Sequence, residues 1–400
     1  MRNFQIVYLL LFIAFYLFLS FSAYKGIKLI SESHKYGKPV RIFFIISGIS
    51  IISAFFILYV WPYNVRSVNS FKLHLILNAI LSIDIVAKLP FLITSFLGLF
   101  LKKNALKISH LMSFILSVAL SLSMIQGTLF IRNQIKVNNI TIQVNGLPVS
   151  FQNYKIVHIS DLHLGSFFQP REVLEEISKR ICNLENDIIV FTGDLVNNFS
   201  YETNGLDSVF QKMTNNRNCY SILGNHDYGN YSEWVDDKSK SQNFEKVVEA
   251  HRKFGFQILN NQNTVIRKSK DSIFIAGVEN WGHPPFPQYA VLDKAQSGIP
   301  LGAFTILLSH DPSHWDEVIK KRDDIRLTLS GHTHGMQWGI SRAGYKFSLA
   351  YLVRRQWSGL YQYGNNFLYV NTGLGMVAMP WRINMPPEIT VITLKRSEVD

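Results

Sequence analysis

The sequence predicts a two-part protein: four membrane-spanning helices followed by an α/β domain built in layers. Four long apolar segments fill residues 1–130, within a chain of 400 residues that is 48% hydrophobic. Residues 131–400 instead alternate short apolar runs with helical stretches, as layered α/β domains do. Polar side chains follow five of these apolar runs, so we expect the second part to carry a site at the ends of its strands.

Each of the four apolar segments is long enough to cross a bilayer core of ~30 Å, which needs ~20 helical residues. They lie at about Phe4–Tyr24, Val40–Trp61, Leu73–Leu101 and Leu111–Phe130. Aromatic residues near the segment ends (Tyr24, Trp61 and Tyr63) suit the membrane interface. A cleaved signal peptide fits less well, because the first segment is too long and three more follow.

The positive charge of the chain lies mainly in this first part. The formal net charge is +12, and residues 1–130 contain 12 Lys and Arg against 2 Asp and Glu. Residues 131–400 contain 28 against 26. A nucleic-acid-binding face would need a positive field of its own, so we expect no nucleic-acid partner for the second part.

Charge in the loops predicts the orientation in the membrane. Eight Lys and Arg residues lie in or beside the first and third loops, against three at the amino terminus and in the second loop. The positive-inside rule then places the first and third loops in the cytoplasm and the carboxyl-terminal domain outside it. Arg132 and Lys136, just after the fourth segment, favour the opposite orientation.

Ionisable residues in the third segment permit two interpretations. Asp84 and Lys88 lie one helical turn apart, and charged groups at membrane depth mark either function or mutual pairing. We favour a self-neutralising pair; transport through the helices is the alternative. Elsewhere, Cys182 and Cys219 have no metal-binding spacing, and the sequence does not establish a disulfide between them.

The second part divides into a connector and a layered domain. The connector comprises residues 131–154. Within it, Asn138–Gln152 alternates polar and apolar side chains around Asn145-Gly146, which indicates a hairpin or an edge strand. Residues 155–396 form the domain. Its strands are expected at 155–160, 187–192, 220–223, 272–277, 304–309, 325–330, 367–371 and 389–394. Its helices are expected at 170–186, 244–254 and 316–321.

Five of these strands end in metal-ligating residue types. In chain order the residues are Asp161 and His163, Asp194, Asn225, His226 and Asp227, His310, and His332 and His334. Imidazoles, carboxylates and an amide oxygen, without a thiolate, suit first-row divalent ions such as Mn, Fe or Zn. Seven such ligands are enough for two ions if one carboxylate bridges them.

In this order the five stretches resemble the motifs of the calcineurin-like metallophosphoesterases over residues 155–395. The resemblance implies a four-layered αββα sandwich and two divalent ions, with Mn expected and Fe, Zn or Mg as alternatives. It assigns Asp161, His163, Asp194 and His334 to the first ion. It assigns Asp194, Asn225, His310 and His332 to the second, with Asp194 bridging.

The same resemblance gives His226 and Asp227 catalytic roles. Two ions ~3.5–4 Å apart would lower the pKa of a bridging water and neutralise phosphoryl oxygens, which allows in-line attack on phosphorus. His226 would face the substrate and protonate or stabilise the leaving oxygen. Asp227 would orient His226, although it could also merely cap the following turn.

The tail resembles a narrower, membrane-associated bacterial branch of the family. Gly373-Leu374-Gly375, Met379-Pro380-Trp381-Arg382 and Pro386-Pro387-Glu388-Ile389 carry this likeness, and Met336 departs from the usual glycine. The branch includes enzymes that cleave UDP-diacylglucosamine. That activity needs a cytoplasmic site, against the loop charges, so we rank it second to hydrolysis of a lipid-linked or envelope phosphate ester or pyrophosphate.

Other features have plainer interpretations. We expect His158, His251, His283 and His314 to be structural. Trp338, Trp357 and Trp381 with Arg354 and Arg355 could form an amphiphilic rim for a lipid phosphate, or a core edge and a surface pair. From a different functional class, the chain could be a non-catalytic membrane sensor or scaffold that retains the fold.

Overall fold

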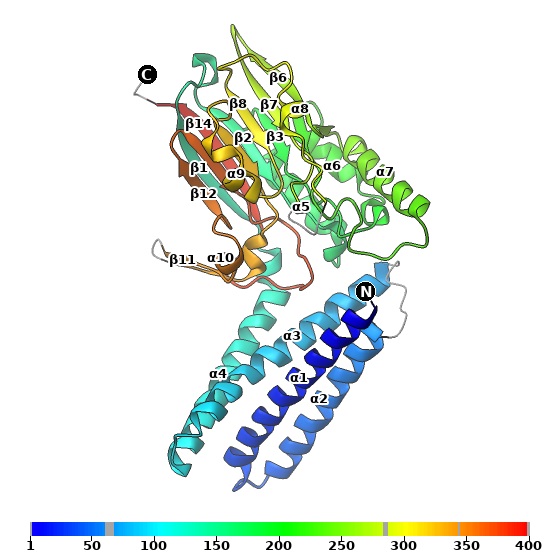
Figure 1. Ribbon diagram of the computed structural model, residues 1–400, viewed down its shortest axis with the longest axis vertical. Coiled ribbons are helices and arrows are strands. Elements are labelled where there is room, and N and C mark those ends of the chain that lie inside the picture. Colours follow the sequence, from blue (N-terminus) through cyan, green and yellow to red (C-terminus); the bar gives the residue numbers. More distant parts are fainter. Residues whose placement is uncertain (1, 61–67, 283–286, 343–344, 398–400) are drawn as a thin grey trace. The chain divides into compact units, whose positions relative to one another are not determined.

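The computed structural model describes residues 2–60, 68–282, 287–342 and 345–397. The chain forms two compact units. Residues up to Leu129 together with Ala378–Trp381 make the four-helix unit, and Phe130–Val377 with the rest of the tail make the α/β unit. Each unit is described by itself below (Figure 1).

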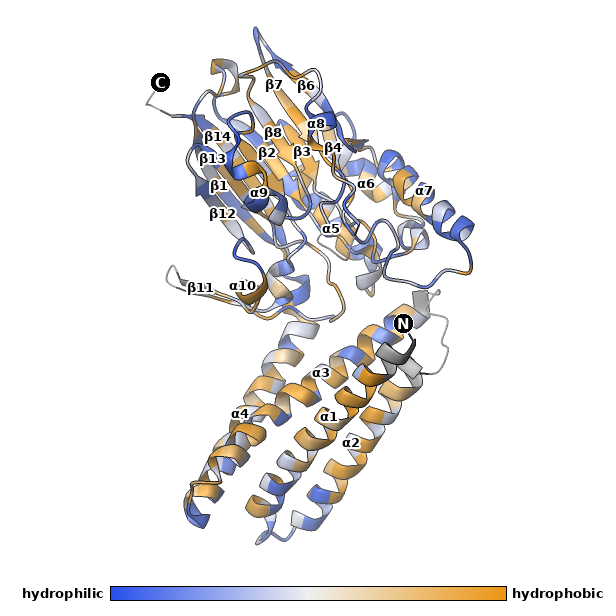
Figure 2. Cartoon of the chain, in the orientation of Figure 1, coloured by the Kyte–Doolittle hydropathy of each residue, from blue (hydrophilic) through white to orange (hydrophobic). Residues whose placement is uncertain are grey.

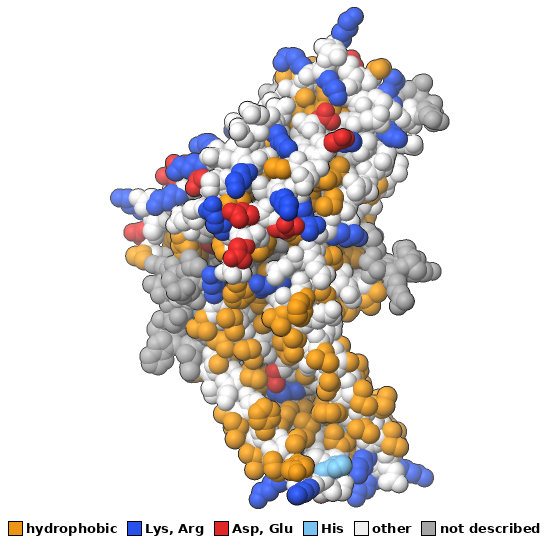
Figure 3. All heavy atoms as spheres, turned by 180° about the vertical axis from the view of Figure 1, so that it is seen from behind, with side chains coloured by type: hydrophobic (Ala, Val, Ile, Leu, Met, Phe, Trp, Pro, Cys, Tyr) orange, Lys and Arg blue, Asp and Glu red, His pale blue; other side chains and the backbone are white. Residues whose placement is uncertain are grey.

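The four predicted apolar segments are all helical. They are α1 (Arg2–Ser31), α2 (Gly37–Val60), α3 (Val68–Leu97) and α4 (Lys103–Leu129). All four are long and apolar enough to cross a membrane. Their surface is largely apolar, with Lys and Arg gathered at one end (Figures 2 and 3). Trp61 and Tyr63, the expected interface aromatics, lie outside the described residues.

Asp84 and Lys88 form the expected pair inside this bundle. Lys88 Nζ lies 2.5 Å from Asp84 Oδ2, and Tyr16 Oη donates to the same oxygen at 2.8 Å. Lys88 also donates to Tyr16 Oη and to Ser20 Oγ. The cation is therefore neutralised and hydrogen-bonded within the helices, as a charge removed from water requires.

The α/β unit contains two six-stranded sheets. The first has the order β1-β14-β2-β3-β4-β5, and the second has the order β12-β13-β9-β8-β7-β6. The strands of the first are β1 (Lys136–Val144), β2 (Tyr154–Ile159), β3 (Ile188–Phe191), β4 (Asn218–Ser221), β5 (Gln257–Ile258) and β14 (Glu388–Arg396). Those of the second are β6 (Gln262–Lys268), β7 (Asp271–Gly277), β8 (Thr305–Leu308), β9 (Leu327–Ser330), β12 (Gly359–Tyr363) and β13 (Asn366–Val370).

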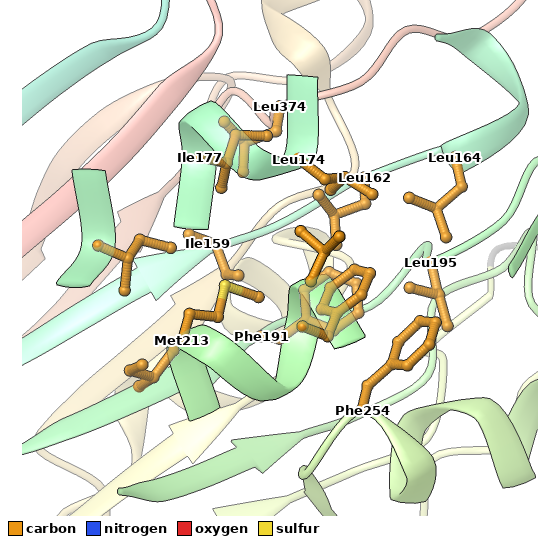
Figure 4. Packing of buried hydrophobic residues seen from close by; sticks show 14 of the residues in the cluster. Ile159, Leu162, Leu164, Leu174, Ile177, Phe191, Leu195, Met213, Phe254 and Leu374 are labelled. Carbon is orange, nitrogen blue, oxygen red and sulfur yellow. The ribbon is translucent and has the colours of Figure 1, made fainter. Parts of the chain in front are cut away.

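Three apolar cores make this unit a four-layered αββα sandwich, as the sequence predicts. One core lies between the sheets and includes Ile156 of β2 and Ile306 of β8. A second packs the outer face of the first sheet against α5 (Pro170–Cys182), α6 (Asp207–Thr214) and α7 (Asp237–Lys253) (Figure 4). A third packs the second sheet against α8 (Leu292–Ala295) and α9 (Ser313–Glu317).

Helix α5 shows how local sequence places a layer. Pro170 occupies its first turn, where a missing N–H does no harm. Leu174, Ile177 and Ile181 are buried on one face, at the helical period. Burying that stripe removes each of these side chains from water, which is worth about 1.5–3 kcal/mol apiece.

The structure corrects several element bounds. Residues 136–144 form an edge strand paired in parallel with β14, so the alternative of a hairpin is wrong. Helix α7 begins at Asp237, before the predicted start at residue 244, because the Asp236 side chain accepts a bond from Ser239 N and caps it. Strands β6 and β12 and the hairpin β10–β11 (Ile340–Arg342 and Tyr345–Phe347) were not predicted. Cys182 and Cys219 are free thiols.

Candidate dimetal centre

The two sheets bring the five polar strand ends to one edge of the sandwich. Strands β2, β3 and β4 are parallel neighbours in the first sheet, and β8 and β9 are parallel neighbours in the second. Parallel strands end at the same edge of a sheet, so the residues that follow them are neighbours in space. The gathered residues are Asp161, His163, Asp194, Asn225, His226, His310, His332 and His334.

A first group of ligand atoms gathers around His163. Its Nε2 lies 3.1 Å from His334 Nε2 and 4.0 Å from Asp161 Oδ1. His334 Nε2 lies 3.3 Å from the same Asp161 oxygen. Asp194 Oδ2 approaches His163 Nε2 at 3.4 Å. The group contains the four residues expected at the first ion.

A second group gathers around His310. Its Nε2 lies 3.0 Å from Asn225 Oδ1 and 3.3 Å from His332 Nδ1. His332 Nδ1 in turn lies 2.8 Å from Asn225 Oδ1. Asp194 Oδ2 lies 3.2 Å from His310 Nε2. One carboxylate oxygen, Asp194 Oδ2, therefore belongs to both groups.

The separations within each group fit a bound cation. Ligand bonds of ~2.1 Å at tetrahedral or octahedral angles place neighbouring ligand atoms about 3.0–3.4 Å apart. Most of the distances above fall in that range. The Nε2 atoms of His163 and His334 lie 3.1 Å apart, so two ring nitrogens face each other directly. These buried groups of His and Asp could hold divalent ions.

The backbone at these residues is bent to aim side chains at the site. Asp161, His163, Asp194, His332 and His334 all have positive φ, between 40° and 71°. Such values cost of order 1–3 kcal/mol each for residues with a Cβ and cluster at functional sites. Two neighbouring positions must be glycine for these side chains to fit. A Cβ on Gly331 would collide with Asp161 Oδ2, and a Cβ on Gly224 would collide with Asp194 Oδ1.

Backbone carbonyls fix the orientation of two of the histidines. His310 Nδ1 lies 2.7 Å from Thr192 O, so this nitrogen donates a proton to the carbonyl and Nε2 faces the second group. His226 Nδ1 lies 2.7 Å from Asn197 O in the same way. The His226 ring stacks on Tyr231 and meets His163 edge to face.

The role expected for Asp227 needs correction. Its carboxylate accepts the backbone N–H groups of Asp194, Leu195, Val196 and Gly224, at 2.8–3.2 Å. Among the described contacts, the hydrogen bond to the Asn197 carbonyl orients the His226 ring instead. Burial and the nearby Asp194 raise the pKa of Asp227 to about 7. Asp227 therefore holds the Asp194 turn in shape and does not orient the imidazole.

The carboxylates of Asp161 and Asp194 stay ionised despite their burial. Burial alone would raise the pKa of Asp161, but the adjacent His334 and His310 hold it well below its usual range. Burial opposes ionisation of Asp194 likewise, and His310 and His226 depress its pKa. Two anionic carboxylates among imidazoles are the donor set that a divalent ion needs.

Sequence reasoning missed two polar groups behind the ligands. Asp311 is buried, with Oδ2 3.8 Å from His332 Nε2, and it accepts bonds from Ser313 and from Arg354 Nη1. Arg382 is fully buried, donates to the carbonyls of Thr372 and Gly373, and has Nη2 3.4 Å from His334 Nδ1. Asp311 directly follows His310 in sequence, a signal that could have found it.

The plainer predictions also have outcomes. His158, His251 and His314 are buried and each bonds a hydroxyl group, so they are structural as expected; His283 lies outside the described residues. The aromatic rim is wrong in part. Trp357 is buried against Ala350 and Met385, and Arg354 is paired with Asp311.

Similarity to known proteins agrees with this geometry. Residues 154–336 match the family model of the calcineurin-like phosphoesterases. The metallophosphoesterase YkuE of Bacillus subtilis, itself uncharacterised, is 33% identical over 261 residues, which are 64% of this chain and 84% of that protein. The chain belongs to the calcineurin-like metallophosphoesterases. It is therefore a hydrolase of phosphate esters.

Two further relatives of this metallophosphoesterase have informative names. A transmembrane protein with a metallophosphoesterase domain from Danio rerio is 30% identical over 272 residues, 66% of this chain and 58% of that protein. The UDP-2,3-diacylglucosamine pyrophosphatase LpxG of Chlamydia trachomatis is 28% identical over 300 residues, 62% of this chain and 86% of that protein.

Proposed function

We propose that this metallophosphoesterase is anchored in a membrane by its four helices and uses two divalent ions to hydrolyse a phosphate ester or pyrophosphate of a lipid-linked or cell-envelope substrate. One observation carries the proposal: Asp194 Oδ2 lies 3.4 Å from His163 Nε2 and 3.2 Å from His310 Nε2. A single carboxylate oxygen shared by two ligand groups is what a pair of bridged ions requires.

The residues divide into two sets of ligands that share one member. Asp161, His163, Asp194 and His334 would hold the first ion, and Asp194, Asn225, His310 and His332 the second. Mn²⁺ is the ion we expect, with Fe, Zn or Mg as alternatives. When bound, such ions activate water and neutralise phosphoryl oxygens.

His226 would act on the leaving group. Its Nδ1–H donates to the Asn197 carbonyl, which leaves Nε2 as the nitrogen that can carry a proton to a substrate oxygen. The ring is also held by its stack on Tyr231. Neither contact is made to one of the seven proposed ligands, so we expect replacement of His226 to leave those ligands in place, although His226 also lies close to His163 and Asp194.

A second candidate is narrower: hydrolysis of UDP-2,3-diacylglucosamine. The likeness to the Chlamydia pyrophosphatase favours it. That reaction needs a cytoplasmic active site, whereas the loop charges favour an extracytoplasmic one. A reporter fused to the carboxyl terminus, scored for activity on either side of the membrane, separates the two candidates.

The proposal is tested on the purified full-length chain. We expect two metal ions per chain by elemental analysis and Mn-dependent hydrolysis of bis(p-nitrophenyl) phosphate that chelation abolishes and Mn restores. A chain that binds two ions but does not hydrolyse chromogenic monoesters, diesters or pyrophosphates would favour a non-catalytic sensor. A chain that binds no ion would contradict the dimetal site itself.

A further inference from the structure

Exposed apolar side chains of the α/β unit are concentrated in one short stretch. Between Val149 and Tyr363, fourteen large apolar side chains are exposed among the described residues. Seven of them fall within the eighteen residues from Met336 to Val353. Soluble surfaces usually carry exposed apolar residues singly, and a concentration of them marks an interaction surface.

The centre of this surface is the turn that joins β11 to α10 (Ala350–Val353), which lie side by side in Figure 1. Leu352 and Val353 are 76% and 74% exposed, and Phe347, Leu349 and Tyr351 about half exposed. Ile340, also half exposed, is the cross-strand partner of Phe347. We call Phe347, Leu349, Tyr351, Leu352 and Val353 the apolar turn.

We propose that the apolar turn is a docking surface for the phospholipid bilayer in which the same chain is anchored. The four helices long enough to cross a membrane keep a bilayer at high effective concentration beside the α/β unit at all times. Exposed Leu, Val, Phe and Tyr side chains next to Arg355, which is also exposed, have the composition of an interfacial anchor. The cation complements anionic headgroups.

The apolar turn is fastened to the loop that carries His332 and His334. The single hydroxyl hydrogen of Ser348 Oγ is shared between the carbonyl oxygens of Gly335 and Trp338, at 2.8 and 2.7 Å. Thr333 Oγ1 donates to Trp357 O at 2.7 Å, on the other side of the turn. These three contacts join residues 348 and 357, on either side of the exposed side chains, to the loop of the candidate metal ligands.

A further contact reaches the strand end that carries His310. Arg354, directly after Val353, donates through Nη1 to Asp311 Oδ1, and Asp311 lies next to His310 and close to His332. A lipid surface that holds the apolar turn would therefore also hold the loops around the second group of ligands. This fits an enzyme whose phosphate-bearing substrate sits in the bilayer, and to that extent it rests on the function proposed above.

Depth-dependent quenching tests the docking without relying on catalysis. In a Cys182→Ser background, which removes the exposed thiol, an environment-sensitive fluorophore is attached at Leu352→Cys in the full-length chain. The chain is placed in nanodiscs of phosphatidylcholine and phosphatidylglycerol that contain spin-labelled lipid. We expect a blue-shifted emission and strong quenching at position 352.

Two matched positions make the result decisive. Leu301 is the fully exposed apolar residue of a different loop, and Leu301→Cys should give neither shift nor quenching. Leu11, exposed on α1, should be quenched if the helices span the bilayer. Quenching at Leu11 with none at Leu352 overturns the docking and leaves the anchoring intact, whereas absence of quenching at Leu11 overturns the anchoring.

Photo-crosslinking identifies what covers the surface. A benzophenone amino acid at position 352 should crosslink to phospholipid in native membranes. Crosslinks mainly to a second copy of the chain, or to another protein, would overturn the proposal. The double variant Leu352→Ser and Val353→Ser, which alters only exposed side chains, should lower spin-label quenching of a fluorophore at Phe347→Cys by several-fold.

Discussion

Two sets of histidines in the α/β unit differ in what their ring nitrogens meet. His158, His251 and His314 lie against the sheets, and each pairs with one hydroxyl group: Thr192, Ser221 and Ser309. The histidines of the candidate centre instead meet carboxylates, an amide oxygen and one another. His163, His310 and His334 are as deeply buried as the structural set, so burial alone does not distinguish a structural histidine from a candidate ligand.

The difference lies in what the contacting ring nitrogens meet, because among the described residues His163 Nδ1 also lacks a hydrogen-bond partner. In the structural set one nitrogen of each ring has no hydrogen-bond partner, and burial lowers the pKa of these three histidines to about 3–4. They are neutral groups held in an apolar setting. At the centre, ring nitrogens of different residues converge on shared points, an arrangement that is costly unless a cation occupies them.

The largest effect should follow from breaking the shared carboxylate. Asp194→Ala removes the one oxygen common to both ligand groups, so we expect loss of both ions and a fall in turnover of about 10³-fold or more, since metal catalysis supplies several kcal/mol. Elemental analysis and diester hydrolysis measure this. Asp237→Ala, an exposed aspartate of α7, is the control. Two retained ions would contradict the bridging role.

Replacing His226 should separate chemistry from metal binding. We expect His226→Ala to retain two ions while turnover falls by about 10²–10⁴-fold, as for loss of a general acid. The loss should be smaller for p-nitrophenyl esters than for alkyl esters, because a good leaving group needs less protonation. An equal loss for both kinds of ester would argue for a role in binding instead.

A smaller effect should follow from the carboxylate behind His332. Asp311→Asn keeps the shape of the side chain but removes the charge that faces His332 Nε2 and pairs with Arg354. Replacement of groups that orient a metal ligand costs about 10–100-fold in metal affinity. Titration of the metal-free chain with Mn²⁺ measures it. Asp316→Asn, which breaks a pair with Lys320 at the surface, should leave the affinity unchanged.

The same comparison explains how far the sequence could predict the site. Adjacent motifs place Asp161, His163, His332 and His334 at strand ends, and the parallel strand order follows from the alternation of strands and helices. Residues that contact the site through their main-chain atoms leave no such motif in the sequence. Asn197 meets His226 only through its carbonyl, and any residue has one. Asp227 has the side chain of an orienting group, yet its oxygens are taken by four amides.

The fold was predictable to a similar depth. Strands with unbroken apolar runs, such as Ile188–Phe191 and Thr305–Leu308, are buried on both faces and appear where expected. Strand β6 was missed because Gln262–Lys268 is mostly half-exposed and polar, and its pairing partner β7 decides its conformation. Long-range pairing of this kind overrides local propensity.

Removing a hydroxyl from the structural set should affect stability without affecting the metals. Ser221→Ala leaves His251 Nδ1 buried without its partner, which costs about 1–3 kcal/mol. Faster hydrogen exchange in β3 and β4 would report the loss. The metal content and the affinity for Mn²⁺ should not change. A variant that lost its ions instead would show that the two sets of histidines are not independent.

The smallest effect concerns acid. Burial lowers the pKa of His251 to about 3, whereas in the unfolded chain it is ~6.5. The stability that this neutral imidazole contributes is therefore fully present above pH 6.5 and falls as pH drops toward 3, because only the unfolded chain takes up the proton, by at most about 1.4 kcal/mol per pH unit. In the double variant Ser221→Ala and His251→Phe, both partners are replaced by apolar groups. Between pH 7 and pH 5, the upper part of this window, hydrogen exchange of β4 should change less in this variant than in the wild-type chain. An unchanged pH dependence would assign the acid sensitivity to other buried groups and would contradict the role given to His251.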